Sequence, residues 1–234
     1  MIPIKNSSFK YLIFLMSAGF ILLQPGCNVN KKRQDKSKVH NKSATHSEYA
    51  GEGWTYLFDG KTFNNWEITN FGTQGPVDIS DNSIVLGMGD GCTGITYTKE
   101  FPKINYEVSL EARKISGNDF FCGITFPYND TFCSFIVGGW GGPVAGLSII
   151  DGKDASENET RTLKKFEHDK WYLIRLKVTG EKIEAWIDNE KIVDFPTEDR
   201  EIDIRPEVSL SRPFGICSWI TTAELREIKL KDNS

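Results

Sequence analysis

The sequence predicts an all-β fold for residues 52–232, built as a two-sheet antiparallel sandwich of the jelly-roll kind. Apolar and polar residues alternate with a period of two along residues 106–113, 172–178 and 183–187, which is typical of strands that bury one face. Turn signals such as Gly180-Glu181 separate these segments, and no stretch keeps a helical period over three turns. Roughly 180 residues divided into many short strands fit one such domain with a sizeable core.

Residues 1–26 have the pattern of a signal peptide. Two lysines precede an apolar run over residues 11–23, which is too short to span a bilayer. Cys27 follows Gly26 just after this run and resembles the lipid-attachment cysteine of bacterial lipoproteins, although Gln24 stands where leucine is usual. We therefore expect a lipid-anchored protein of the bacterial cell envelope, with plain secretion as the alternative.

The segment from Cys27 to residue 51 is expected to be a disordered polar tether. It carries six Lys or Arg residues and no apolar periodicity, so it cannot bury enough surface to fold. The basic cluster at 31–33 is interpreted as part of a solvated spacer rather than as a lipid contact. The domain beyond it has no basic patch interleaved with aromatic residues, so nucleic acid is not an expected partner. Membrane contact is expected through the lipid anchor only.

The later strands are expected to form at least one hairpin. Residues 183–187 and 191–195 flank Asp188-Asn189, a turn signal between two alternating segments.

Four cysteines also fall within the domain and allow three disulfide pairings, with buried free thiols equally plausible. They are Cys92, Cys122, Cys133 and Cys217.

Four segments carry a resemblance to a known family. Residues 54–63 with Trp66 are similar to the opening signature of the 3-keto-disaccharide hydrolase domain family. Residues 171–175, 183–190 and 225–230 match that family's late strands in order, so the likeness spans 53–231. The resemblance implies the architecture of the concanavalin A-like lectins and glucanases, whose curved sheet holds carbohydrate on its concave face. It also implies a carbohydrate-active protein.

Two polar signatures of the family are altered in this chain. Residues 118–123 stand where typical members carry Asn-Ser-Gly, and residues 215–219 stand where they carry Gln-Asp-His. Outside the tether the one remaining histidine is His168, which is interpreted as a solvated loop residue. The histidine count therefore excludes a histidine-rich metal site in the domain.

The family's chemistry needs a base and an oxyanion stabiliser. Oxidation at C3 of a sugar acidifies the hydrogen at C2, so that a base can remove it before the group on C1 leaves. Glu111 or Asp119 as base, with Arg113 as cation, is the catalytic hypothesis for this chain. The alternative for Glu111 and Arg113 is a cross-strand ion pair on a solvated sheet face.

Residues 201–207 superficially resemble the paired-glutamate strand of laminarinase-like sandwiches. Two glutamates six residues apart on an extended strand are ~20 Å apart, whereas a retaining mechanism needs carboxyl groups about 5 Å apart. Pro206 also lacks a ladder donor. This segment is therefore interpreted as structural.

The strongest site candidate is a glycine-flanked tryptophan followed by an acidic loop. Gly138, Gly139, Gly141 and Gly142 flank Trp140, an arrangement that suits a ring exposed for stacking on a sugar. The residues expected to contact the sugar with Trp140 are Asp151, Asp154, Glu157 and Arg161. Of these, Asp151, Asp154 and Glu157 are also candidate ligands of a calcium ion, which takes oxygen ligands.

Two functions remain open from the sequence. One is an envelope hydrolase or lyase that acts on oxidised or ordinary glycosides, and the other is a non-catalytic, lectin-like carbohydrate-binding module. The loss of the family's histidine favours binding, whereas the dense acidic loop 151–159 keeps catalysis open. For the acidic loop itself, the alternative is a glycine bulge followed by solvated carboxylates.

Overall fold

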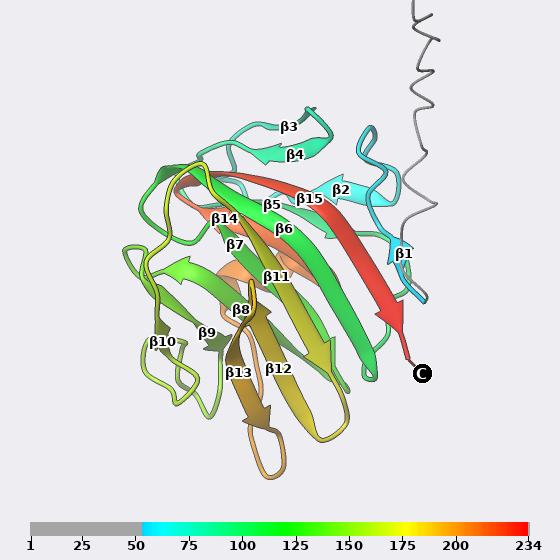
Figure 1. The fold of residues 1–234 in the computed structure, drawn as a ribbon, viewed down its shortest axis with the longest axis vertical. Helices are drawn as coiled ribbons and strands as arrows, with labels where there is room; N and C mark the ends of the chain where they lie inside the picture. Colours follow the sequence, from blue (N-terminus) through cyan, green and yellow to red (C-terminus); the bar gives the residue numbers. More distant parts are fainter. Residues whose placement is uncertain (1–52, 234) are drawn as a thin grey trace, which may run out of the picture. The chain divides into compact units, whose positions relative to one another are not determined.

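The computed structural model describes residues 53–233, which form a sandwich of two antiparallel sheets (Figure 1). Sheet A has eight strands in the order β13-β12-β11-β6-β15-β4-β3, with β1 paired to β15, and sheet B has seven in the order β10-β9-β8-β7-β14-β5-β2. The predicted all-β jelly-roll sandwich is thereby confirmed. The predicted signal peptide, the predicted lipid-attachment residue Cys27 and the predicted tether lie outside the described residues.

The strands of sheet A are β1 Thr55–Tyr56, β3 Val77–Ser80, β4 Ser83–Leu86, β6 Tyr106–Gly117, β11 Trp171–Val178, β12 Lys182–Ile187, β13 Glu190–Pro196 and β15 Thr221–Asp232. Those of sheet B are β2 Trp66–Ile68, β5 Cys92–Tyr97, β7 Cys122–Tyr128, β8 Thr131–Gly139, β9 Val144–Ser148, β10 Thr162–Leu163 and β14 Phe214–Trp219. Within residues 53–233 the only helical segment is the 3-10 helix η2, Pro206–Ser211. The predicted hairpin is confirmed, because Ile183 pairs with Phe195 and Ile187 with Glu190 across β12 and β13.

The period of two decides which face of each strand enters the core. On β6, Tyr106, Val108, Leu110 and Ala112 are fully buried between the sheets, and the residues between them point outward. On β8, Phe135 and Val137 are buried in the same core, so that Ile136 lies on the outer face of sheet B. Burial of each such aliphatic or aromatic side chain contributes about 1.5–3 kcal/mol to stability.

The four cysteines of the domain are free thiols and all are buried. Burial raises the pKa of the Cys133 thiol to about 12, so this sulfur stays protonated and unreactive at neutral pH. In the described part of the chain, no helix is both long enough and apolar enough to cross a membrane.

Candidate functional site

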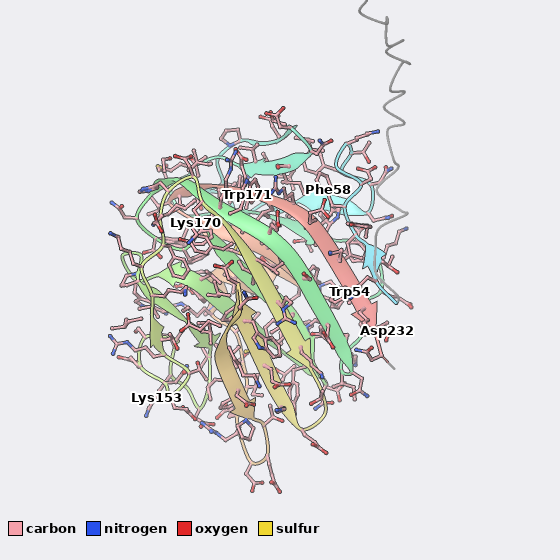
Figure 2. The ribbon with its side chains drawn as sticks, viewed as in Figure 1. Trp54, Phe58, Lys153, Lys170, Trp171 and Asp232 are labelled. Atoms are coloured by element: carbon pink, nitrogen blue, oxygen red, sulfur yellow. The ribbon has the colours of Figure 1, made fainter. Side chains whose placement is uncertain are left out.

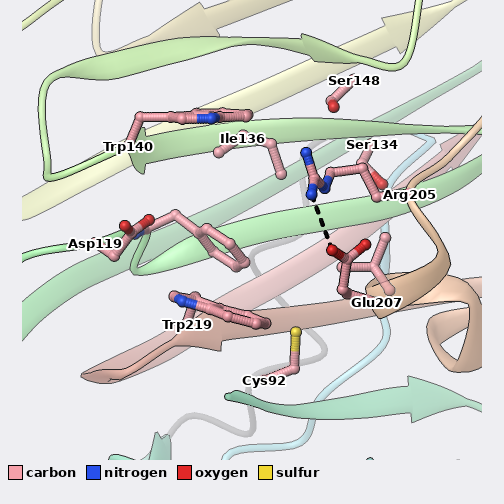
Figure 3. Close-up of a pocket in the computed structure, with 11 residues that line it drawn as sticks. Cys92, Asp119, Ser134, Ile136, Trp140, Ser148, Arg205, Glu207 and Trp219 are labelled. Carbon is pink, nitrogen blue, oxygen red and sulfur yellow. Dashed lines mark hydrogen bonds and ion pairs between the residues drawn. The ribbon is translucent and has the colours of Figure 1, made fainter. Parts of the chain in front are cut away.

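The outer face of sheet B holds a pocket of about 250 Å³ (Figure 3). Its floor comes from β5, β8, β9 and β14, and its walls come from the loops around residues 119–120 and 140 and from the segment at η2. The lining residues are Cys92, Asp119, Phe120, Ser134, Ile136, Trp140, Ser148, Arg205, Glu207, Val208 and Trp219. The pocket therefore joins segments that are more than 120 residues apart in the chain.

The loop that carries Trp140 is held in a left-handed backbone conformation. Trp140 has φ 51°, and Gly141 and Gly142 beside it have φ 81° and 111°, a region that L side chains rarely adopt. The Asp119 carboxylate accepts a hydrogen bond from the Gly141 amide at 3.2 Å and another from the Phe120 amide at 2.8 Å. Asp119 therefore fixes the loop, and 37% of the Trp140 surface stays exposed.

The opposite wall depends on an ion pair. Arg205 donates to the Glu207 carboxylate at 2.8 Å and to the Asp154 carboxylate at 3.2 Å. The Arg205 guanidinium holds the pKa of Glu207 below its usual range, so Glu207 is ionised at neutral pH. The 3-10 helix η2 lies close over β14, because Gly215 leaves room for the backbone of Ser211, and an added Cβ would meet the Ser211 carbonyl oxygen at 2.6 Å.

Two serines on neighbouring strands line the pocket side by side. Ser134 on β8 and Ser148 on β9 are cross-strand partners, and both are buried. The Ser134 hydroxyl lies 3.1 Å from the Thr125 hydroxyl. The Ser148 Oγ has no hydrogen-bond partner, and a buried hydroxyl in that state costs about 1–3 kcal/mol.

The environments of the six tryptophans differ in a way that bears on ligand stacking. Trp66 belongs to the core. Trp171 begins β11 on sheet A (Figure 2). Two guanidinium groups stack on its indole, Arg113 at 4.7 Å and Arg226 at 3.9 Å. Arg175 and Lys191 stack on the indole of Trp186. Lys229 stacks on the indole of Trp54. Trp140 and Trp219 line the pocket, and within residues 53–233 no cation is stacked on either indole.

The predicted catalytic trio is not assembled in one place. On the outer face of sheet A, Glu111 pairs with Arg226 at 2.6 Å and Arg113 pairs with Glu224 at 2.7 Å. Both are cross-strand pairs between β6 and β15, as in the structural alternative. Asp119 alone of the trio reaches the pocket. The three residues are separated because residues 111 and 113 belong to sheet A, and the chain passes to sheet B only after Gly117.

The aspartates of the acidic loop are bound by arginines. Asp151 accepts a hydrogen bond from Arg200 at 2.7 Å, and the same contact lowers the pKa of Asp151. Asp154 accepts bonds from the Ser156 hydroxyl at 2.6 Å and from Arg205. Asp154 thus reaches the pocket indirectly, because it helps to hold Arg205 in the wall.

The remaining residues predicted for this loop do not line the pocket. Glu157 and Arg161 are exposed and are not among the pocket-lining residues. Across residues 53–233, no group of three or more His, Cys, Asp or Glu side chains is placed to hold a metal ion. Asp151, Asp154 and Glu157 are therefore not brought together as a calcium site, since arginines already neutralise the two aspartates.

Several pocket residues were not predicted from the sequence. Arg205 and Glu207 belong to the segment 201–207, for which the sequence predicts a structural role, and its only signal of a site is a dense run of charges around Pro206. Trp219 and Phe120 lie in the two stretches where the chain departs from the family's polar signatures. Those departures were the available signal, because both stretches border the pocket.

Comparison with known proteins places the fold. A provisionally assigned glycosyl hydrolase from Parabacteroides distasonis ATCC 8503 is 15% identical, with a TM-score of 0.50 over 78% of this chain and 95% of that chain. The Crh5 transglycosylase in complex with NAG is 11% identical, with a TM-score of 0.56 over 78% and 85%. At these identities the likeness shows the sandwich fold alone. No curated protein matches the chain.

Residues 53–231 match a family described as the 3-keto-alpha-glucoside-1,2-lyase-like domain, in agreement with the resemblance carried by residues 54–63 and by the late strands. Because the match covers most of the chain, from the strand β1 to the strand β15, the protein belongs to the 3-keto-alpha-glucoside-1,2-lyase-like domain family.

Proposed function

We propose that this domain is carbohydrate-active and that the pocket of sheet B binds one sugar residue of a glycan. The observation that carries the proposal is the pair of tryptophans, Trp140 and Trp219, that line the pocket without a stacked cation. A sugar ring offers apolar C–H faces to such indoles and hydroxyl edges to polar side chains such as Arg205 and Glu207. Membership of the family supports a carbohydrate as the ligand.

The size of the pocket fits this ligand. Its volume of about 250 Å³ lies just below the range of roughly 300–1,000 Å³ in which drug-sized ligands are enclosed. One sugar ring therefore fits, and the rest of a glycan would extend into solvent. The outer face of sheet A is the alternative surface for a sugar, because the family resemblance implies carbohydrate bound on the face of a sheet. On that face, however, cations already stack on the indoles of Trp171 and Trp186.

Titration calorimetry with a panel of glycosides tests the proposal. Trp140→Ala and Trp219→Ala are each expected to weaken binding roughly tenfold, by analogy with the ~1–3 kcal/mol of stacking a base on an aromatic ring. Trp186→Ala is the matched control, because it removes an indole from the opposite sheet. Equal affinities for wild type and both pocket variants, with all proteins folded, would contradict the proposal.

A second function, catalysis on a glycoside, is favoured by one specific observation. Asp119 and Glu207 place carboxylates on opposite walls of the pocket, and Glu207 is bound by the Arg205 guanidinium. An ionised Glu207 suits a base that removes a proton next to a ketone, and Arg205 suits the oxyanion that forms. This replaces the trio inferred from the sequence with three residues of one pocket.

The catalytic proposal is tested by incubating the protein with 3-keto and ordinary glycosides and measuring the released sugar. Glu207→Gln is expected to lower the rate by about 10²-fold or more while sugar binding persists. Glu111→Gln, on sheet A, is the control and should leave the rate unchanged. If the wild-type protein releases no sugar from any glycoside it binds, the binding role stands alone.

A further inference from the structure

One buried group in the pocket lacks a partner. Among residues 53–233 three buried side-chain polar atoms have none: Gln74 Oε1, Ser148 Oγ and Ser211 Oγ. Of these residues only Ser148 lines the pocket. It ends β9, is fully buried, and its hydroxyl is turned toward Ile136 and Arg205 (Figure 3). The hydroxyl is thus presented to the space that a ligand would fill.

The polar side chains beside Ser148 form their hydrogen bonds with other groups. Ser134, its cross-strand partner, already interacts with Thr125 at 3.1 Å. Arg205 donates to Asp154 and to Glu207 and forms no hydrogen bond with Ser148. Ser148 is therefore the one lining hydroxyl with both its donor and its acceptor capacity available.

The charge around the pocket restricts which ligand can supply the missing bond. Asp119 and Glu207 are carboxylates on opposite walls. Lys114 interacts electrostatically with Asp119, and the Arg205 guanidinium binds both Glu207 and Asp154, so three carboxylates face two cations. An acidic sugar would enter against this negative excess and would have to displace a carboxylate from Arg205. A neutral sugar has no such cost, and its hydroxyls both donate and accept.

Building on the proposed sugar-binding function, we propose that Ser148 is a specificity-determining residue of this pocket. Its hydroxyl bonds one ring hydroxyl of an uncharged sugar residue whose face lies against Trp140 or Trp219. Uronic acid residues are rejected by the carboxylates of the wall.

The experiment uses the full chain and three sets of probes: methyl pyranosides of neutral hexoses, their matching uronides, and monodeoxy analogues of the hexose that binds best. Ser148→Ala is expected to weaken the binding of the best neutral glycoside roughly tenfold, which corresponds to 1.4 kcal/mol. One monodeoxy analogue should bind wild type and Ser148→Ala equally, because it lacks the sugar hydroxyl and neither complex can then form the bond. The uronide should bind wild type at least tenfold more weakly than the neutral glycoside.

Stability separates this role from a structural one. Ser148→Ala should leave the melting temperature of the ligand-free protein unchanged or slightly raised, because it deletes a buried hydroxyl that has no partner. Ser134→Ala, the matched control, should lower the melting temperature because Thr125 loses its partner.

If neutral glycosides bind Ser148→Ala as tightly as wild type, the inference is overturned while the sugar-binding function stands. If uronides bind as tightly as neutral glycosides, the charge argument is overturned. If no glycoside binds the wild-type protein, the proposed function fails and the inference fails with it.

Discussion

At the scale of single residues, the pocket depends on groups that hold others in place. Asp119 is the clearest case, because its two carboxylate oxygens bind the amides of Phe120 and Gly141. Lys114 is close enough to this carboxylate to interact with it electrostatically, although burial lowers the pKa of the lysine. Trp140 owes its exposed position to this arrangement, since its own backbone conformation is an unfavourable one for a tryptophan.

Replacement of Asp119 tests this dependence. Asp119→Ala removes both acceptors, so we expect stability to fall by about 1–3 kcal/mol and sugar affinity to fall several-fold as Trp140 loses its fixed position. Asp119→Asn keeps one acceptor oxygen and should retain more of the affinity. Thermal denaturation measures the stability and calorimetry measures the affinity. An unchanged affinity in Asp119→Ala would show that the carboxylate does not hold Trp140 in its binding position.

At the scale of elements, the two sheets use their outer faces differently. The outer face of sheet A is closed by ion pairs and by cations stacked on aromatic rings, such as Arg226 between Glu111 and Trp171. The outer face of sheet B is covered in part by η2, which contributes Glu207 and Val208 to the pocket. The close approach of η2 to β14 requires a glycine at position 215.

Gly215→Ala is expected to displace η2. The added methyl group would meet backbone oxygens of Ser211 at 2.6 Å and of Ile95 at 2.9 Å, an overpacking that costs about 1–3 kcal/mol of stability. Sugar affinity should also fall, because the wall that holds Glu207 moves. Urea denaturation and calorimetry provide the two measurements. Gly180→Ala is the control, since nothing lies within 4 Å of the added atom, and it should lower neither stability nor sugar affinity.

At the scale of the whole molecule, the sandwich is proposed to be held at the envelope by an N-terminal lipid. The basis is Cys27 directly after the apolar run of residues 11–23. A flexible tether of the length of residues 28–51 has an average span of ~27 Å. Such a tether would let an anchored domain reach glycans near the membrane surface.

Cys27→Ser tests the anchor. The substitution removes the thiol that would be acylated, so we expect the protein to move from the membrane fraction to the soluble fraction of the cell. Cys92→Ser is a useful control, because Cys92 is buried in the sandwich and its replacement should leave fractionation unchanged. Retention of Cys27→Ser at the membrane would contradict anchoring through a lipid on Cys27.

The sequence by itself determined the strands and their buried faces. A strand that packs one face on a core imposes a period of two on the chain, and this pattern placed the strands β6, β11 and β12 and their hairpin partner β13. The resemblance carried by residues 54–63 and by the late strands pointed to the family, because the residues that match it are spread over most of the domain. The glycines around Trp140 likewise indicate an exposed ring, and 37% of the Trp140 surface is exposed.

Only the tertiary structure decided which candidate side chains meet. The periodicity correctly pointed Glu111 and Arg113 outward, but it does not say which sheet a strand joins or which face receives the ligand. Sheet order placed β14 between β7 and β5, so Trp219 and Cys92 came to line the same pocket as Asp119. These contacts bring together residues far apart in the chain, and local patterns carry no information about such partners because packing between distant segments selects them.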